Sequence, residues 1–150
     1  MLTDKEGLQI AYEEAKAGFD EGGVPIGAAL VSADGKLLGK GRNLRVQLGS
    51  PIHHGETSAL FNTGRLPASA YKGTGACLLY GIARVVIGEN KTFLGGEAYL
   101  KQRGVEVVVL DNPECRALMD AFIEKSPELW NEDIGVEERV YSKEGHSAPA

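Results

Sequence analysis

The chain has 150 residues, of which 43% are hydrophobic and 25% are charged, and its formal net charge is −5 at pH 7. This composition is typical of one soluble globular domain and argues against a disordered chain. The acidic balance leaves no electrostatic footprint for nucleic acid or for an anionic membrane surface, so we expect neither as a partner.

Two features indicate the compartment. No apolar run approaches the ~20 residues needed to cross a bilayer, and residues 1–7 lack the basic and apolar segments of a secretory signal. The two cysteines, Cys77 and Cys115, cannot form a disulfide framework. We therefore expect a protein of the cytoplasm, with the nucleus as an alternative, whose thiols are reduced.

The first quarter of the chain predicts a helix followed by a β-hairpin. Apolar residues recur at helical spacing over residues 3–19, with Thr3 suited to the helix start. The apolar run 24–31 predicts a buried strand, and Asp34-Gly35 predicts a hairpin turn before a second strand at 37–44.

The remaining elements alternate between helices and β-branched strands. We expect them at 54–63 (helix), 74–81 (helix), 84–88 (strand), 97–103 (helix), 105–110 (strand) and 113–125 (helix, with Asn112 as its cap). The order strand, helix, strand makes the last two strands parallel. The high glycine content, 20 residues, predicts tight turns and close backbone approaches. We expect one domain over 1–135 and a disordered tail over 136–150.

The informative motif is His54-Gly55-Glu56 at the start of the second long helix. His-x-Glu alone is a weak signal, and the two side chains could simply cap the helix, since an acidic first turn favours the helix dipole. The surrounding sequence makes the motif a stronger signal, because Asn43 ends a predicted strand upstream and a Gly-Ser-Pro loop at 49–51 leads into the motif.

Together with several other segments, this motif resembles the fungal-type cytosine deaminases of the zinc-dependent cytidine deaminase-like superfamily. The matching segments span nearly the whole chain in one order: 11–15, 21–27, 54–56, 80–82, 86–90, 99–100, 104–109 and 130–135. The resemblance implies an α/β fold, a three-layer α/β/α sandwich around a mixed sheet. It also implies a homodimer that binds one zinc ion and hydrolyses cytosine to uracil in pyrimidine salvage.

The resemblance assigns the chemistry to the motif. Zinc deaminases activate a water with the metal, and a glutamate that is not a ligand carries the proton. By resemblance His54 is a zinc ligand, Glu56 is the proton shuttle, Gly55 offers a backbone N–H and Asn43 hydrogen-bonds the pyrimidine edge. His53 could compete for the metal, but the His-x-Glu spacing favours His54. His146 lies in the tail, where we expect it to be solvated.

The resemblance also implies a wall and a gate for the pocket. Ile26, Phe93 and Trp130 would line it, and Asp133 would hold the amino group of the base. The alternatives from residue type alone are core packing for Ile26, Phe93 and Trp130 and a capping role for Asp133.

The sequence departs from the family in one place. The second half of the zinc signature, Pro-Cys-x-x-Cys, is absent, and Lys72 is followed at once by Gly73 where a strand and both cysteine ligands are expected. Cys77 would reach the metal only if its helix slid by one turn, ~5.4 Å, so we expect a buried hydrophobe there. For Cys115 we expect a structural role, with a lowered thiol pKa at a helix start as the alternative.

This departure has consequences for stability and activity. The missing strand is the central one, so the strands at 24–31 and 84–88 must either expose backbone groups or pair directly. Unpaired buried groups cost ~1–3 kcal/mol each, so we expect low stability unless these strands pair. We also expect impaired zinc binding and turnover. The alternatives are a noncatalytic deaminase-like subunit, or a deaminase of another small base such as guanine; the acidic charge argues against a tRNA base.

Overall fold

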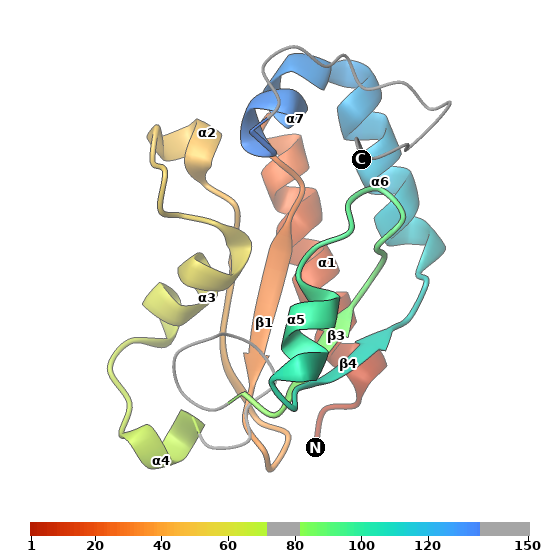
Figure 1. The fold of residues 1–150 in the computed structure, drawn as a ribbon. Coiled ribbons are helices and arrows are strands. Elements are labelled where there is room, and N and C mark those ends of the chain that lie inside the picture. The colour runs from red at the N-terminus through yellow and green to blue at the C-terminus, as the bar shows by residue number, and fades with distance from the viewer. Residues whose placement is uncertain (72–81, 136–150) are drawn as a thin grey trace.

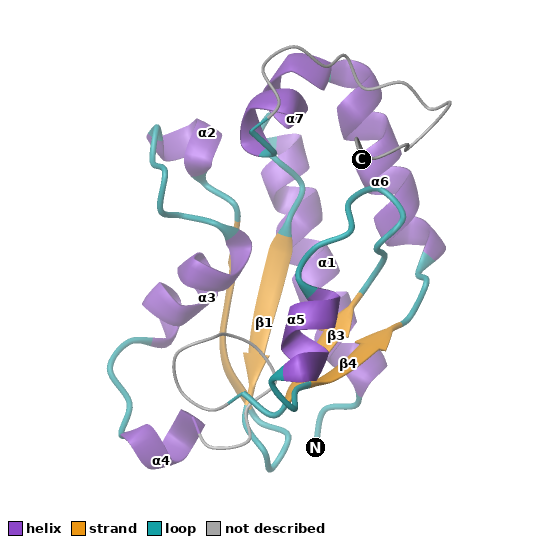
Figure 2. Ribbon diagram, viewed as in Figure 1, coloured by secondary structure: helices purple, strands orange, loops and turns teal. Residues whose placement is uncertain are grey.

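The computed structural model describes residues 1–71 and 82–135. Within these residues helices alternate with short strands, in agreement with the predicted α/β class (Figure 2). The predicted helix at 74–81, which contains Cys77, and the expected tail from residue 136 lie outside the described residues.

Helix α1 (Asp4–Asp20) begins where the sequence predicts. The Oγ1 of Thr3 accepts a hydrogen bond from the backbone N–H of Glu6 (3.3 Å), and the Glu6 carboxylate accepts one from the backbone N–H of Thr3 (2.8 Å). This capping box satisfies two backbone donors that the first turn leaves without a helical partner.

Strands β1 (Gly27–Val31) and β2 (Leu37–Arg42) form the predicted antiparallel hairpin. Ser32 N donates to Lys36 O (2.9 Å) across the turn. Both strands are shorter than expected. The Val24-Pro25-Ile26 segment folds into a tight turn, with Ile26 N donating to Val24 O (2.9 Å), and Asn43 N donates to Ile26 O (2.8 Å) directly after β2.

Glycines allow helices to pack closely on both faces of this hairpin. A side chain at Gly27 would collide with the backbone of α1, and one at Gly41 would collide with the backbone of α3 (Gly55–Thr63). The predicted close approaches are therefore confirmed at these two glycines, which lie on opposite faces. Figure 1 shows the hairpin between α1 and α3, two layers of the expected sandwich.

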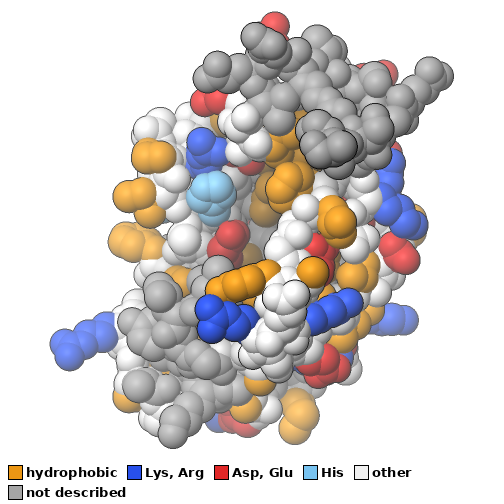
Figure 3. Space-filling view, in the orientation of Figure 1, with side chains coloured by type: hydrophobic (Ala, Val, Ile, Leu, Met, Phe, Trp, Pro, Cys, Tyr) orange, Lys and Arg blue, Asp and Glu red, His pale blue; other side chains and the backbone are white. Residues whose placement is uncertain are grey.

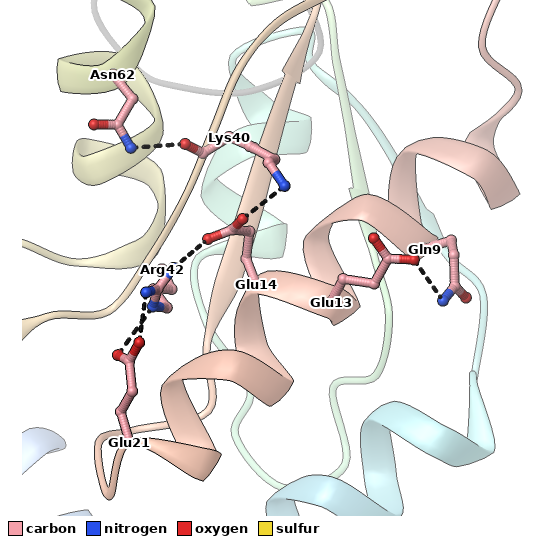
Figure 4. A network of polar contacts seen from close by, with 7 residues as sticks. All are labelled: Gln9, Glu13, Glu14, Glu21, Lys40, Arg42 and Asn62. Atoms are coloured by element: carbon pink, nitrogen blue, oxygen red, sulfur yellow. Dashed lines mark hydrogen bonds and ion pairs between the residues drawn. The ribbon is translucent and has the colours of Figure 1, made fainter.

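Polar contacts fasten α1 to β2. The Glu14 carboxylate, whose side chain is 12% exposed, pairs with Lys40 (2.9 Å) and with Arg42 (2.8 Å), and Arg42 also binds Glu21 (2.6 Å) (Figure 4). Burial raises the pKa of the Glu14 carboxyl, but the hydrogen bonds from Lys40 and Arg42 outweigh burial and hold that pKa below its ordinary 4.5.

Strands β3 (Arg84–Ile87) and β4 (Glu106–Val109) are joined through α5 (Glu97–Gln102) and pair in parallel, from Arg84 with Glu106 to Ile87 with Val109. The predicted strand-helix-strand unit is therefore confirmed. Each strand ends one residue before its predicted end.

The two pairs of strands form separate sheets, so of the two alternatives for the outer strands, direct pairing is not what the described part of the chain shows, and exposed backbone groups are. A cavity of about 790 Å³ lies between them, lined among others by Ala28 of β1 and Val86 of β3. Each facing edge keeps a row of backbone groups for which the described residues form no ladder.

Helix α6 (Pro113–Lys125) starts as predicted, because the Asn112 side chain accepts from Glu114 N (2.8 Å) and Cys115 N (3.0 Å). Three short helices were not predicted: α2 (Arg45–Leu48), α4 (Ala68–Tyr71) and α7 (Pro127–Asp133). Helix α7 packs on α6 and closes the main hydrophobic core, whose buried members are Val24, Met119, Phe122, Ile123 and Trp130.

Across residues 1–71 and 82–135, none of the helices combines the length and the apolar character needed to span a membrane.

Candidate functional site

The His-x-Glu motif forms the first turn of α3. His54 is the N-cap, with extended backbone angles (φ −71°, ψ 169°), but its side chain makes no capping hydrogen bond. The interpretation that the imidazole caps the helix is therefore wrong. Glu56 lies in the first turn, where the positive end of the helix dipole favours a carboxylate.

Gly55 brings this turn against the start of β1. A Cβ at Gly55 would lie 3.2 Å from the backbone oxygen of Ile26 and 3.3 Å from its Cγ2. A Cβ at these distances would be tighter than an ordinary van der Waals contact, so glycine lets the motif pack closely beside Ile26.

Asn43 is completely buried and lies on the other side of Ile26. Its backbone N–H donates to Ile26 O (2.8 Å), and its side-chain Oδ1 accepts from the backbone N–H of Arg45 (3.0 Å). Because that partner is a donor, the amide orientation is fixed and Nδ2 is the atom left over. Nδ2 is buried and has no hydrogen-bond partner among residues 1–71 and 82–135.

Asp133 reaches the site from the end of α7. Its Oδ1 pairs with Nη1 of Arg45, and the side chains are 9% and 24% exposed, respectively. The carboxylate expected to hold the amino group of a base is thus held by an arginine that lies two residues after Asn43. Arg45 thereby links two predicted site residues that are far apart in the sequence.

The three predicted wall residues lie together. Trp130 is 2% exposed and belongs to the core, and its ring meets the ring of Phe93 edge-on at 6.2 Å. Ile26 packs against the same core. All three also line a cavity of about 310 Å³, so core packing and pocket lining are not alternatives at these positions.

The structure does not place every predicted residue in one cavity. Glu56 lines the 790 Å³ cavity between the sheets, whereas the wall residues line the 310 Å³ cavity, and Gly27 lines both. Asp133 lines a third cavity of about 320 Å³, together with Arg45. Figure 3 shows the hollowed face, bordered by hydrophobic, acidic and histidine side chains.

The neighbouring histidine is already engaged. The Nδ1 of His53 lies 2.8 Å from Ser50 Oγ, and its ring packs edge-on against Phe61 at 5.9 Å. This geometry agrees with the preference for His54 over His53 as the metal ligand. His146 lies outside the described residues.

Cys115 has no sign of reactivity. Burial raises the pKa of its thiol, and the charges of Glu89 and Glu114 raise it further. Its Sγ packs so closely on Gly88 that a Cβ there would lie 2.7 Å away. The alternative of a lowered thiol pKa is wrong, and the structure places Cys115 in a packing role.

Comparison with known proteins places this arrangement in a family. The model of the cytidine and deoxycytidylate deaminase zinc-binding region matches residues 1–93. The chain is 51% identical over 147 residues to the cytosine deaminase of Candida albicans (strain SC5314 / ATCC MYA-2876), covering 89% of this chain and 98% of that protein. The chain therefore belongs to the cytidine and deoxycytidylate deaminase family.

Two solved structures share the fold. One comes from a study of A-to-I editing by tRNA deaminases at the wobble position of transfer RNA (TM-score 0.58, 21% identity, 76% of this chain and 99% of that chain). The other is a mutant of NE0047 in complex with 8-azaguanine (TM-score 0.65, 17% identity, 82% of this chain and 85% of that chain). These likenesses confirm the deaminase-like α/β fold.

The family implies zinc, but the described residues do not complete a zinc site. A catalytic zinc takes three protein ligands and a water. Within residues 1–71 and 82–135, no group of three His, Cys, Asp or Glu side chains is placed to hold a metal ion. His54 supplies one imidazole, and Cys77 and Gly73 lie outside the described residues. The donor set described here therefore does not fit the metal.

Sequence reasoning missed Arg45. Nothing in the local pattern singles it out, because its partner Asp133 lies 88 residues further along the chain. The available signal was its spacing of two residues from Asn43, the spacing at which an asparagine side chain bonds the backbone ahead of it.

Proposed function

We propose that this chain binds a free pyrimidine base, cytosine, and that its own hydrolytic turnover is impaired. The observation that carries the proposal is the buried Nδ2 of Asn43, a donor for which the described part of the chain supplies no acceptor. A buried unpaired donor costs about 1–3 kcal/mol. A ligand carbonyl at this position would remove that cost.

The side chains of Asn43 and Asp133 offer a donor and an acceptor, which match the carbonyl and the amino group on the edge of cytosine. Asn43 Nδ2 would donate to the ring carbonyl, and the second oxygen of the Asp133 carboxylate, which lines a separate cavity with Arg45, would accept from the exocyclic amino group. Phe93 and Trp130 supply an aromatic wall for the flat ring. The acidic charge of the chain and the small cavity both favour a free base over a nucleic acid.

In the family reaction, cytosine and water give uracil and ammonia. The water oxygen bonds to the ring carbon that carries the amino group, the C–N bond breaks, and the amine leaves with added protons. Glu56 is the group for the proton transfers, first to the ring nitrogen and then to the leaving amine. Zinc supplies the activation of water in this family, and we assign no step to it here.

We infer that turnover is impaired because, in the described part of the chain, His54 belongs to no group of three side chains that could hold a metal ion. The same observation favours a second candidate, a noncatalytic deaminase-like subunit that keeps the base-binding half of the site. The two candidates differ in turnover, which is slow in the first and absent in the second.

We also propose that the chain forms the homodimer expected of the family and acts in the cytoplasm. The surface around α3 supports the dimer, since Ile52 is 68% exposed and Phe61 is 74% exposed. Large apolar side chains gathered in this way mark association surfaces. Light scattering coupled to gel filtration measures the mass: twice 16.0 kDa is expected, and 16.0 kDa would contradict the dimer.

The test of the proposed function combines metal analysis with a panel of bases. We expect well under one zinc per purified chain, saturable binding of cytosine, and little loss of cytosine absorbance over hours. Guanine, adenine and cytidine serve as matched controls and are expected to bind more weakly. One zinc per chain together with rapid loss of cytosine absorbance would refute impairment, and preferential binding of guanine would refute the substrate assignment.

A further inference from the structure

Arg45 holds two of the proposed base-contacting residues at once, although nothing in the family motif names it. Its backbone N–H binds the side chain of Asn43 (3.0 Å), and its guanidinium pairs with the carboxylate of Asp133. One residue thus connects the start of α2 to α7, across 88 positions of sequence.

The ion pair is sheltered from solvent. The side chains of Arg45 and Asp133 are 24% and 9% exposed, in contrast to the surface pair of Lys16 and Asp20 at 53% and 58%. Exposed pairs contribute little, whereas removing one partner of a sheltered pair leaves a charge without compensation. The Nε of Arg45 is buried with no partner, so the bond to Asp133 is the contact that orients the guanidinium.

Asp133 and Trp130 are three residues apart on α7 and therefore lie on neighbouring positions of one face. Fixing the carboxylate of Asp133 also fixes the indole of Trp130, which packs on Phe93. The polar contact to the base and its aromatic wall are thereby coupled through a helix of seven residues.

The two contacts of Arg45 have different origins. The contact to Asn43 is made by the backbone and survives any change of side chain. The contact to Asp133 is made by the guanidinium and is lost with it. A substitution at Arg45 therefore separates recognition of the amino group, through Asp133, from recognition of the carbonyl, through Asn43.

We propose that Arg45 is the positioning residue that sets specificity for the amino group of the base: its guanidinium pins α7 and thereby fixes the carboxylate of Asp133. This inference rests on the proposed function. It extends that function by naming the residue that makes Asp133 a fixed acceptor. An ionised carboxylate accepts hydrogen bonds only, so a fixed Asp133 favours an amino group over a carbonyl.

The test uses Trp130, the single tryptophan of the chain, as a spectroscopic reporter. In the full-length chain, Arg45→Met keeps an apolar stem of similar length and removes the charge. We expect acrylamide to quench Trp130 more strongly in Arg45→Met than in the wild type. Arg45→Lys is a second variant that keeps the charge without the planar fork, and we expect an intermediate result.

Ligand titrations separate the two halves of recognition. Cytosine is compared with 2-pyrimidinone, which is the same ring without the amino group. We expect Arg45→Met to weaken cytosine binding by about tenfold or more. We expect a clearly smaller loss for 2-pyrimidinone, which shares the Trp130 wall but has no amino group for Asp133 to bind. The matched control is Arg84→Met, which removes another long-range arginine pair, with Asp4, at the far end of α1; no change is expected.

The outcomes are distinguishable. Equal quenching and equal cytosine affinity in Arg45→Met and the wild type would overturn the inference, as would equal losses for cytosine and 2-pyrimidinone. If the wild type binds neither ligand, the proposed function fails and the specificity role fails with it. The quenching comparison then still decides whether Arg45 pins α7.

Discussion

The candidate site has two halves, and the structure assembles one of them more completely than the other. The half that would bind the base is assembled from long-range contacts, with Asn43 bonded to Ile26 and Arg45, and Arg45 paired with Asp133. The half that would carry out hydrolysis has His54 and Glu56 at the start of α3, beside a large cavity and without a three-ligand cluster in the described residues.

This difference shows that the two parts depend on different pieces of the sequence. The base-binding half needs the hairpin, the start of α2, the segment that carries Phe93 and α7. The hydrolytic half needs, in addition, ligands from a segment that the family places between β1 and β3. The alignment with the Candida protein extends over 147 residues but covers only 89% of this chain, so that protein has positions that this chain lacks.

The largest effect is expected from restoring that segment. Inserting a strand followed by Pro-Cys-x-x-Cys between Lys72 and Gly73 should raise the metal content to about one zinc per chain. We expect turnover of cytosine to rise by about 10²-fold or more, since activation of water by a metal and its proton shuttle are then combined. Metal analysis and the loss of cytosine absorbance measure both effects.

The matched control carries alanine at both inserted cysteines. It should raise the melting temperature, because a strand fills the cavity between the sheets, and yet bind no zinc. Glu56→Gln in the inserted chain should lower kcat by about 10²–10⁴-fold. If the inserted chain and the original chain show equal zinc content and equal kcat, the comparison between the two halves is wrong.

An intermediate effect is expected at Asn43. Asn43→Ala removes the acceptor of the Arg45 N–H and should lower the free energy of unfolding by about 1–3 kcal/mol. It should also abolish cytosine binding, because the donor to the base is lost. Urea denaturation and ligand titration measure the two effects. Asn62→Ala is the control, since its Nδ2 bonds Lys40 O (2.9 Å) at the surface; an equal loss there would contradict the special role of Asn43.

The smallest effect concerns pH and the hairpin that supports the base-binding half. The folded pKa of Glu14 is lowered below 4.5, so its contribution is fully present above 4.5 and is lost as the pH falls through the folded pKa. Glu14→Gln should therefore cost about 1–2 kcal/mol at pH 7, and the difference from wild type should shrink in acid. Glu13→Gln, on the exposed face of α1 (Figure 4), is the control. A constant difference across pH 3–7 would contradict this account.

The sequence predicts much of the fold because its signals are local. Helical spacing with a capping Thr3, the Asp34-Gly35 turn and the Asn112 cap each act over a few residues, and the structure has each of these elements. Helix α7 was missed because seven residues carry too little periodicity, and its stability comes from packing on α6 and the core.

The site is predictable only in part. The family resemblance identifies four candidate site residues, His54, Glu56, Asn43 and Asp133, but their roles remain predictions. The sequence contains no signal for the pairing of Arg45 with Asp133, which depends on how α7 lies against the loop after β2. The sequence left open whether the strands at 24–31 and 84–88 would pair or stay apart, because the answer depends on which strand edges meet in space.

Saturation-transfer NMR of cytosine with the purified wild-type chain tests the central claim most directly, because one spectrum reports both binding and conversion. The account predicts transfer of saturation to the ring protons of cytosine, while the signals of uracil stay absent or grow only slowly. Rapid growth of the uracil signals, or the absence of any transfer to cytosine, would contradict it.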